Sequence, residues 1–294
     1  MSRIATIGFF DGVHLGHRYV FDCLLTKAQE LRLKPLIVTF RQHPREVLQN
    51  GYVPKLLTTP EERKRLLESY SETLILDFRD IYMLTAEQFM VYLRERYAVV
   101  GILMGYDHRF GSDRLCAYRD YAAAGKAAGI EIYQLPQYMP QTASAGDGLP
   151  QHVSSTEIRS LLQGGKASEA NELLGYPYTL TGEVVHGNGI GRELGFPTAN
   201  IRLQEGYKLV PKEGVYKAEA HIYGRWHKAV LNIGTNPTIG NPAQTIEVHI
   251  PDYQGDLYGQ EIQVRVLSRL RDEQRFADKA ALTAQIQRDI TACK

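Results

Sequence analysis

The chain has 294 residues, more than a single hydrophobic core usually serves, so we expect two domains. Hydrophobic residues make up 44% and charged residues 23%, which excludes a disordered, collagen-like or disulfide-scaffold chain. The formal net charge of +1 gives no reason to expect a nucleic-acid or membrane partner.

The cysteines and the N-terminal residues favour a cytoplasmic location. Cys23, Cys116 and Cys293 are scattered without a pairing or zinc-ligand pattern, as expected in a reducing compartment. The apolar run within Met1–Gly8 is too short for a secretory signal. No stretch approaches the roughly 18 apolar residues that a membrane helix needs.

The first half of the chain alternates compact apolar runs with amphipathic stretches of helical period. Thr59-Pro60-Glu61-Glu62 is typical of a helix start, because it combines a capping hydroxyl, an early proline and first-turn acids. The expected strands are Ile4–Gly8, Pro35–Phe40, Thr73–Phe78, Val99–Gly105 and Ile130–Leu135. The expected helices are His17–Leu33, Thr59–Ser69, Thr85–Tyr97 and Tyr118–Ala128.

This alternation predicts a Rossmann-like domain with a parallel sheet and right-handed helical crossovers. Ligands of such domains bind beyond the carboxyl ends of the strands. We therefore expect the chemistry in the loops that follow Gly8, Phe40 and Gly105.

A loop over Pro136–Gln151 and two short helices, Ser155–Leu162 and Ser168–Leu174, lead to a change of pattern. Gly175-Tyr176-Pro177 is the expected boundary, which gives domains 1–175 and 176–294.

Beyond the boundary, period-two alternation without intervening helices predicts a small antiparallel barrel. The expected strands are Leu180–Val185, Gly214–Ile222, Trp226–Ile233, Thr245–Ile250 and Glu261–Leu267. Asp272–Thr291 is the expected terminal helix.

The loop after the first strand carries the first candidate site. His14 and His17 are three residues apart with Gly16 between them, at the start of a helix whose N–H groups and dipole favour phosphate. Gly16 allows close approach of a phosphate, and the imidazoles can donate to it as charge develops. The alternative is an ordinary turn with solvated histidines. The residues expected to hold ATP here are Gly8, Phe9, Asp11 and Gly16.

His14-x-Gly16-His17 resembles the HxGH signature of the nucleotidyltransferase superfamily. A second run, Val153 to Arg159, resembles the SSTxIR element of those enzymes, which lies near the ATP triphosphate. The resemblance implies that Arg159 stabilises phosphate charge and that the preceding hydroxyls bind ATP. A plain helix cap is compatible with the same residues. The three hydroxyl residues are Ser154, Ser155 and Thr156.

Two further loops resemble the flavin-binding segments of flavin-nucleotide adenylyltransferases. One is the His43-Pro44-Arg45 run, and the other spans Gly105–Gly111. The family often has phenylalanine where this chain has His108. Solvated loop charge is the alternative for each segment alone. The resemblance implies flavin contacts from His43, Arg45, Asp107, Arg109 and Phe110.

The second half carries a glycine-rich run, His186–Asn200, whose N–H groups can wrap phosphates. It is neither a Walker loop nor a Rossmann fingerprint, and a hairpin loop is the alternative for the glycines alone. Thr198 and Asn200 are two apart on an extended run, so they point the same way and offer oxygens suited to Mg²⁺. The glycines expected near ATP are Gly187, Gly189, Gly191 and Gly195.

The Gly195-Phe-Pro-Thr-Ala-Asn200 run resembles the riboflavin kinase family, which has a six-stranded barrel. Other elements of that family are present at 214–216, 232–238, 247–249 and 270–274. The resemblance implies that Glu247 is the catalytic base and that Arg271 and Glu273 bind flavin.

Both halves together resemble the bacterial bifunctional riboflavin kinase/FMN adenylyltransferases, the FAD synthetases, over nearly the whole chain. The resemblance implies that riboflavin, FMN and ATP are bound, that Mg²⁺ is needed, and that FMN and then FAD are made. A homo-oligomer is possible. The alternatives are an adenylyltransferase with another acceptor, a flavin carrier without turnover, and an enzyme with one idle domain.

Overall fold

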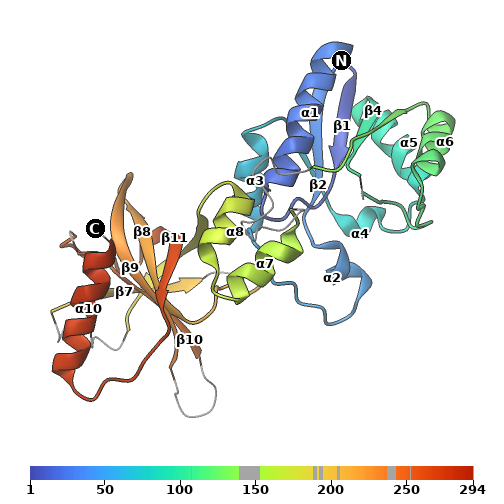
Figure 1. Ribbon diagram of the computed structural model, residues 1–294. Helices are drawn as coiled ribbons and strands as arrows, with labels where there is room; N and C mark the ends of the chain where they lie inside the picture. Colours follow the sequence, from blue (N-terminus) through green and yellow to red (C-terminus); the bar gives the residue numbers. More distant parts are fainter. Residues whose placement is uncertain are drawn as a thin grey trace, which may run out of the picture. The chain divides into compact units, whose positions relative to one another are not determined.

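The computed structural model describes residues 1–106, 108–138, 153–187, 191, 195–203, 206–236, 243–251 and 253–293 (Figure 1). It forms two compact units, Met1–Ser155 and Thr156–Lys294. Each unit is described here by itself.

The first unit is built on a five-stranded sheet in the order β3-β2-β1-β4-β5. Every neighbouring pair in it is parallel, which confirms the expected doubly wound class. Because β1 is central, the loop after it opens at the middle of the carboxyl edge. The strands are β1 (Arg3–Ile7), β2 (Lys34–Phe40), β3 (Thr73–Leu76), β4 (Val99–Met104) and β5 (Glu131–Gln134).

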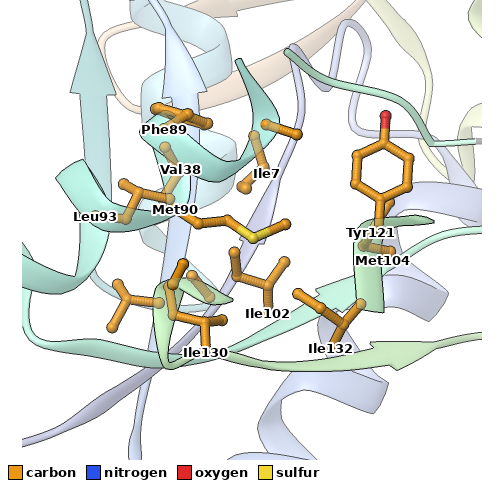
Figure 2. Close-up of a cluster of buried hydrophobic side chains, with 14 of the residues drawn as sticks. Ile7, Val38, Phe89, Met90, Leu93, Ile102, Met104, Tyr121, Ile130 and Ile132 are labelled. Atoms are coloured by element: carbon orange, nitrogen blue, oxygen red, sulfur yellow. The ribbon is translucent and has the colours of Figure 1, made fainter. Parts of the chain in front are cut away.

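Helices cover both faces of this sheet, because successive strand residues point to opposite sides. Ile4 packs with α1 (Leu15–Leu31) and α3 (Pro60–Glu68) on one face. Ala5 packs with α5 (Ala86–Tyr97) and α6 (Tyr118–Ala128) on the other. Figure 2 shows the second cluster, where Met90 and Leu93 of α5 lie against the sheet residues Val38 and Ile102.

Two short helices were not expected from the sequence, α2 (Pro44–Leu48) and α4 (Phe78–Ile81). Both are a single turn, too short for a hydrophobic period, and each begins at a side-chain cap. His43 caps α2 and Asp77 caps α4. Local hydrogen bonds at the strand ends therefore make these turns.

The second unit contains a closed antiparallel barrel in the order β10-β7-β6-β11-β8-β9, which confirms the expected six-stranded architecture. Five of its strands match the period-two runs. The sixth, β7 (Thr198–Leu203), was expected only as an extended run, because it carries the ATN motif in place of alternating apolar residues. The others are β6 (Tyr178–Val185), β8 (Gly214–Ile222), β9 (Arg225–Asn236), β10 (Ala243–His249) and β11 (Glu261–Arg271).

The terminal helix α10 (Lys279–Cys293) begins seven residues later than Asp272, where the sequence predicted its start. Arg269 and Arg271 explain the delay, because their guanidinium groups donate to the side chain and carbonyl of Asp272 and hold that segment outside the helix. Ile290 of α10 packs on the barrel with Val215 and Val230.

Two helices precede the barrel, α7 (Ser155–Gln163) and α8 (Ala167–Leu174). Asn171 of α8 donates to the Val266 and Leu267 carbonyls of β11 and accepts from the Tyr178 amide. These bonds explain why the compact units divide at Ser155. The functional division at residue 175 stays a prediction.

Candidate active sites

The β1–α1 loop of the first unit is anchored by a buried carboxylate. Both oxygens of Asp11 accept from the Leu57 amide at 3.0 Å, and one also accepts from the amide and hydroxyl of Thr58 at 3.0 Å. The Gly12 amide donates back to Thr58 Oγ1 at 3.1 Å. Phe10 and Val13 have positive φ angles, 54° and 39°, so the loop holds strained backbone that this anchoring stabilises. Asp11 therefore fixes the loop.

His14 and His17 form a stacked pair with ring centroids 3.6 Å apart and an interplanar angle of 20°. Burial lowers the pKa of His17 well below its ordinary range, and the charge of His14 lowers it further. At neutral pH the His17 ring is therefore neutral and carries one N–H donor.

The start of α1 differs from the starts of its neighbours. The α3 and α5 helices have Thr-based capping boxes with acids in the first turn. The α1 helix has no side-chain cap at His14 and no acid in its first turn. A side chain at Gly16 would lie 3.3 Å from the His14 ring and 3.4 Å from the Val153 carbonyl. The positive end of the α1 dipole is therefore not balanced by an acid in the first turn, and the backbone at Gly16 is closely packed. Both features favour the binding of an anion.

The SSTxIR run begins in the first unit and continues into the second. Ser155 Oγ donates to the Asp11 carbonyl at 2.9 Å, which ties Ser155 to the β1–α1 loop within the first unit. Thr156 and Arg159 follow on α7, with Arg159 one helical turn after Ser155. Ser154 directly precedes the helix.

The first expected flavin segment lies beside this loop. The His43 ring meets the Phe9 ring edge-on at 4.8 Å, and His43 Nδ1 accepts from the Arg45 amide at 3.1 Å. The Arg63 guanidinium stacks over Phe9 at 4.0 Å. Phe9 and His43 are thus brought to the same strand ends, with Arg45 in α2.

The second expected flavin segment lies at the end of β4. A small cavity of about 50 Å³ there is lined by Gly105, His108 and Arg109 among others. Phe110 is half-buried, and its amide donates to the Tyr121 hydroxyl at 2.9 Å. Asp107 lies outside the described residues.

The larger candidate site is a cavity of about 610 Å³, lined by barrel strands on one side and by α10 on the other. Its size suits a small organic substrate. Six of the residues expected from sequence line it together: Gly191, Thr198, Asn200, Glu247, Arg271 and Glu273. They come from β7, β10, β11 and the segments next to them.

Strand register places the polar groups of this cavity side by side. Glu247 lies opposite Asn200 on one neighbouring strand and opposite Asn232 on the other. Thr198 Oγ1 donates to Glu247 Oε2 at 3.2 Å. A side chain at Gly187 would overlap the Asn200 amide, so any other residue there would displace that amide. Closed-barrel pairing therefore brings a carboxylate, a hydroxyl and two amides to one wall.

Arg271 and Asp289 form an ion pair at the opposite wall. Arg271 Nε and Nη2 donate to the Asp289 carboxylate at 3.1 and 2.7 Å, and Gln285 Nε2 also donates to it at 2.8 Å. The pair joins the end of β11 to α10 and spans the segment that carries Glu273. Asn232 Nδ2 lies 3.5 Å from Glu273 Oε1.

Several residues that line the cavity were not predicted as site residues, and the polar and aromatic ones among them include Phe196, Asn232, His249 and Asp289. The first three stand inside or next to family-like runs, so their neighbours were the available signal. Asp289 had none, because a helical acid reads as a solvated charge. Gly195 lies just before β7 at φ 83°, while Gly189 lies outside the described residues.

The residues around Thr198 offer oxygen atoms to a divalent cation. Within the part of the chain that the structure describes, no cluster of three or more His, Cys, Asp or Glu could hold a metal. The Thr198 hydroxyl donates its hydrogen to Glu247, so the lone pairs of its oxygen are available to a cation. Asn200 contributes an amide oxygen from the same cavity. Sparse oxygen donors suit Mg²⁺, which usually binds through few protein ligands, water and substrate phosphates.

Comparison with known proteins gives the same two parts. A family model described as FAD synthetase matches residues 1–146, and one described as riboflavin kinase matches residues 174–294. A bifunctional riboflavin kinase/FMN adenylyltransferase of Escherichia coli K12 is 36% identical over 97% of this chain and 90% of its own. The protein of that name from Bacillus subtilis 168 is 34% identical over 98% of this chain and 90% of its own.

One solved structure resembles the whole chain. It is a Streptococcus pneumoniae protein described as a macrolide-efflux protein, with 30% identity, a TM-score of 0.88, and coverage of 99% of this chain and 93% of that one. Efflux is said of that protein alone. Among the residues described here, no helix is both long and apolar enough to cross a membrane.

The resemblance inferred from the motifs is therefore confirmed over both halves. This chain belongs to the bifunctional riboflavin kinase/FMN adenylyltransferase family, with its FAD synthetase part at the N-terminus and its riboflavin kinase part at the C-terminus.

Proposed function

We propose that the barrel cavity phosphorylates riboflavin to FMN and that the β1–α1 loop site adenylylates FMN to FAD, each with ATP. The observation that carries the proposal is the shared cavity of Thr198, Asn200 and Glu247. An acceptor for a proton and oxygen donors for a phosphate-bound cation lie there on one wall. Domains 1–175 and 176–294 are the proposed functional division.

In the kinase step, Glu247 accepts the proton of the terminal ribityl hydroxyl of riboflavin as that oxygen attacks the γ-phosphorus of ATP. The bond to the bridging oxygen breaks, and FMN and ADP leave. The Thr198 hydroxyl at 3.2 Å orients the carboxylate. Gly187 and Gly191 lie where their backbone can approach ATP phosphates.

Thr198 and Asn200 would hold Mg²⁺ in this cavity. When bound, the cation would supply positive charge that neutralises the phosphates of ATP. The protein's own part is to present the two oxygens side by side from one strand.

In the adenylyl step, an FMN phosphate oxygen attacks the α-phosphorus of ATP in line, and pyrophosphate leaves. His14 and His17 donate to the triphosphate, and Arg159 adds a planar guanidinium. No side chain forms a covalent intermediate. The residues proposed to support the ATP here are Gly8, Phe9, Asp11, Gly16, Ser154, Ser155 and Thr156.

The proposed flavin contacts differ between the parts. Arg271 and Glu273 serve riboflavin in the barrel. His43, Arg45, Arg109 and Phe110 serve FMN in the first unit, together with Asp107. Cytoplasmic location and assembly into a homo-oligomer belong to the same proposal.

The test incubates the purified chain with riboflavin, ATP and Mg²⁺ and separates the flavins by chromatography. The proposal predicts FMN first and FAD afterwards. Formation of FMN alone, with added FMN left unchanged, would contradict the N-terminal assignment. Unchanged riboflavin and unchanged FMN would favour a flavin-binding protein without turnover.

A further inference from the structure

The strand that carries Glu247 makes three consecutive contacts with the segment that ends the glycine-rich run. Thr198 Oγ1 donates to Glu247 Oε2 at 3.2 Å. The carbonyl of Pro197, one residue earlier, lies 2.9 Å from His249 Nδ1. The ring of Phe196 meets the His249 ring edge-on at 5.7 Å and 82°.

His249 stands in a fixed relation to the proposed cation ligands. It lies directly opposite Thr198 in the β10–β7 pairing and two residues from Glu247, so both side chains share one face of β10. Its side chain lines the cavity and is 9% exposed. It therefore lies in the cavity beneath α10, on the face of β10 opposite to the buried core residue Val248.

The partner atom fixes the tautomer of this imidazole. A carbonyl oxygen only accepts, so His249 Nδ1 must carry the hydrogen and donate. A buried donor of this kind fixes the position and orientation of the Pro197 peptide group. The next residue in the chain is Thr198, whose hydroxyl oxygen is a proposed cation ligand.

We propose that His249 is a positioning residue for the kinase site: through its Nδ1–H bond to Pro197 it sets the Thr198 oxygen in register with Asn200 and Glu247. In this way β10, which carries both Glu247 and His249, would align the oxygen donors of β7 with the proton acceptor. This inference rests on the proposed roles of Thr198 and Glu247.

The test compares His249→Asn with His249→Leu in the full chain. Asparagine places an amide N–H close to the position of Nδ1, whereas leucine keeps bulk and loses the donor. Removal of such supporting groups typically costs about 10- to 100-fold in metal affinity or activity. We expect His249→Leu to raise the Mg²⁺ concentration for half-maximal FMN formation about tenfold, and His249→Asn to restore most of the loss.

A second readout does not depend on turnover. ADP is titrated into each variant by calorimetry with and without Mg²⁺, and the Mg²⁺-dependent gain in affinity is compared. The N-terminal site contributes equally to every variant. We expect the gain to shrink about tenfold in His249→Leu and to persist in His249→Asn. His221→Leu, on β8 beside Trp226, is the matched control and should leave the gain intact.

Failure of this inference differs from failure of the proposed function. If Thr198→Val abolishes the Mg²⁺-dependent gain while His249→Leu keeps it, His249 has no positioning role. If Thr198→Val itself retains both the gain and FMN formation, the proposed cation site is wrong. If His249→Leu does not fold, His249→Asn decides the question. A folded His249→Asn variant that loses the Mg²⁺-dependent gain in ADP affinity as fully as Thr198→Val does would overturn the inference.

Discussion

The two candidate sites are built in opposite ways. The centre of the β1–α1 loop site consists of residues adjacent in sequence, which Leu57, Thr58 and Ser155 contact from elsewhere in the chain. The barrel cavity draws its residues from five strands and a helix, spread from Gly191 to Asp289. The first site depends on a helix terminus, and the second depends on strand register.

This difference determines how each site can fail. A shift of one residue in the pairing of β10 would turn Glu247 away from Thr198 and out of the cavity. The loop site has no such register, and we expect it to lose function when single donors are removed or when the Asp11 anchor is lost.

The largest effect is expected from Glu247→Gln. The amide keeps the shape of the carboxylate but cannot take the ribityl proton, so FMN formation should fall by about 10²- to 10⁴-fold. The rate of conversion of added FMN to FAD should stay within about twofold of that of the unchanged chain. The substitution lies in the barrel and leaves the N-terminal site untouched. Both rates are measured by flavin chromatography. A variant that still phosphorylates riboflavin at the original rate would remove Glu247 as the base.

The matching change in the other site is His17→Ala. Loss of one preorganised donor to the triphosphate should lower FAD formation by about 10²- to 10³-fold. FMN formation from riboflavin should be unaffected, since the barrel is untouched. Equal loss of both products would mean that the two activities do not occupy separate sites.

The next largest effect concerns the ion pair between Arg271 and Asp289. Asp289→Ala leaves the Arg271 guanidinium without its carboxylate and should lower barrel stability by about 2 to 3 kcal/mol, the low end for buried pairs because Arg271 is 20% exposed. Denaturant unfolding followed by the fluorescence of Trp226, the single tryptophan, reports it. Glu183→Gln breaks the exposed pair with Arg202 and is the control, with an expected cost of about 0.5 kcal/mol or less.

The smallest effect concerns pH. The pKa of His17 is lowered in the folded chain, so below about pH 6.5 the unfolded chain binds a proton that the folded chain does not. Stability of the first unit should therefore fall as pH drops from about 6.5 towards the folded pKa, by about 1.4 kcal/mol per unit of difference. His17→Gln should flatten this slope in calorimetric unfolding, whereas His186→Gln in the other unit should not. An unchanged slope in His17→Gln would contradict the burial of a neutral ring.

The fold was predictable wherever the hydrophobic period was regular. The parallel sheet and five barrel strands followed from alternation, and α3 and α5 from their caps. β7 could be read only from the Thr198–Asn200 motif, because its residues face a polar cavity. The start of α10 was wrong because Asp272 is held by arginines that tertiary structure brings to it.

The site was predictable as a set of residues and not as an arrangement. The motif glycines, His14 and Glu247 could be named from short runs. The stacking of His14 on His17, the contact of His249 with Pro197 and the pairing of Asp289 with Arg271 join residues whose types carry no signal alone. Only pairing register and helix packing bring them together.

The most direct test of two separable sites is complementation in one tube. The His17→Ala and Glu247→Gln variants are each incubated with riboflavin, ATP and Mg²⁺, and then mixed in equal amounts. Two separate sites predict FMN alone from the first variant, unchanged riboflavin from the second, and FAD from the mixture. A mixture that makes no FAD, although the first variant releases FMN and the second converts added FMN, would contradict transfer between independent sites. Loss of both activities in either single variant would contradict the separation itself.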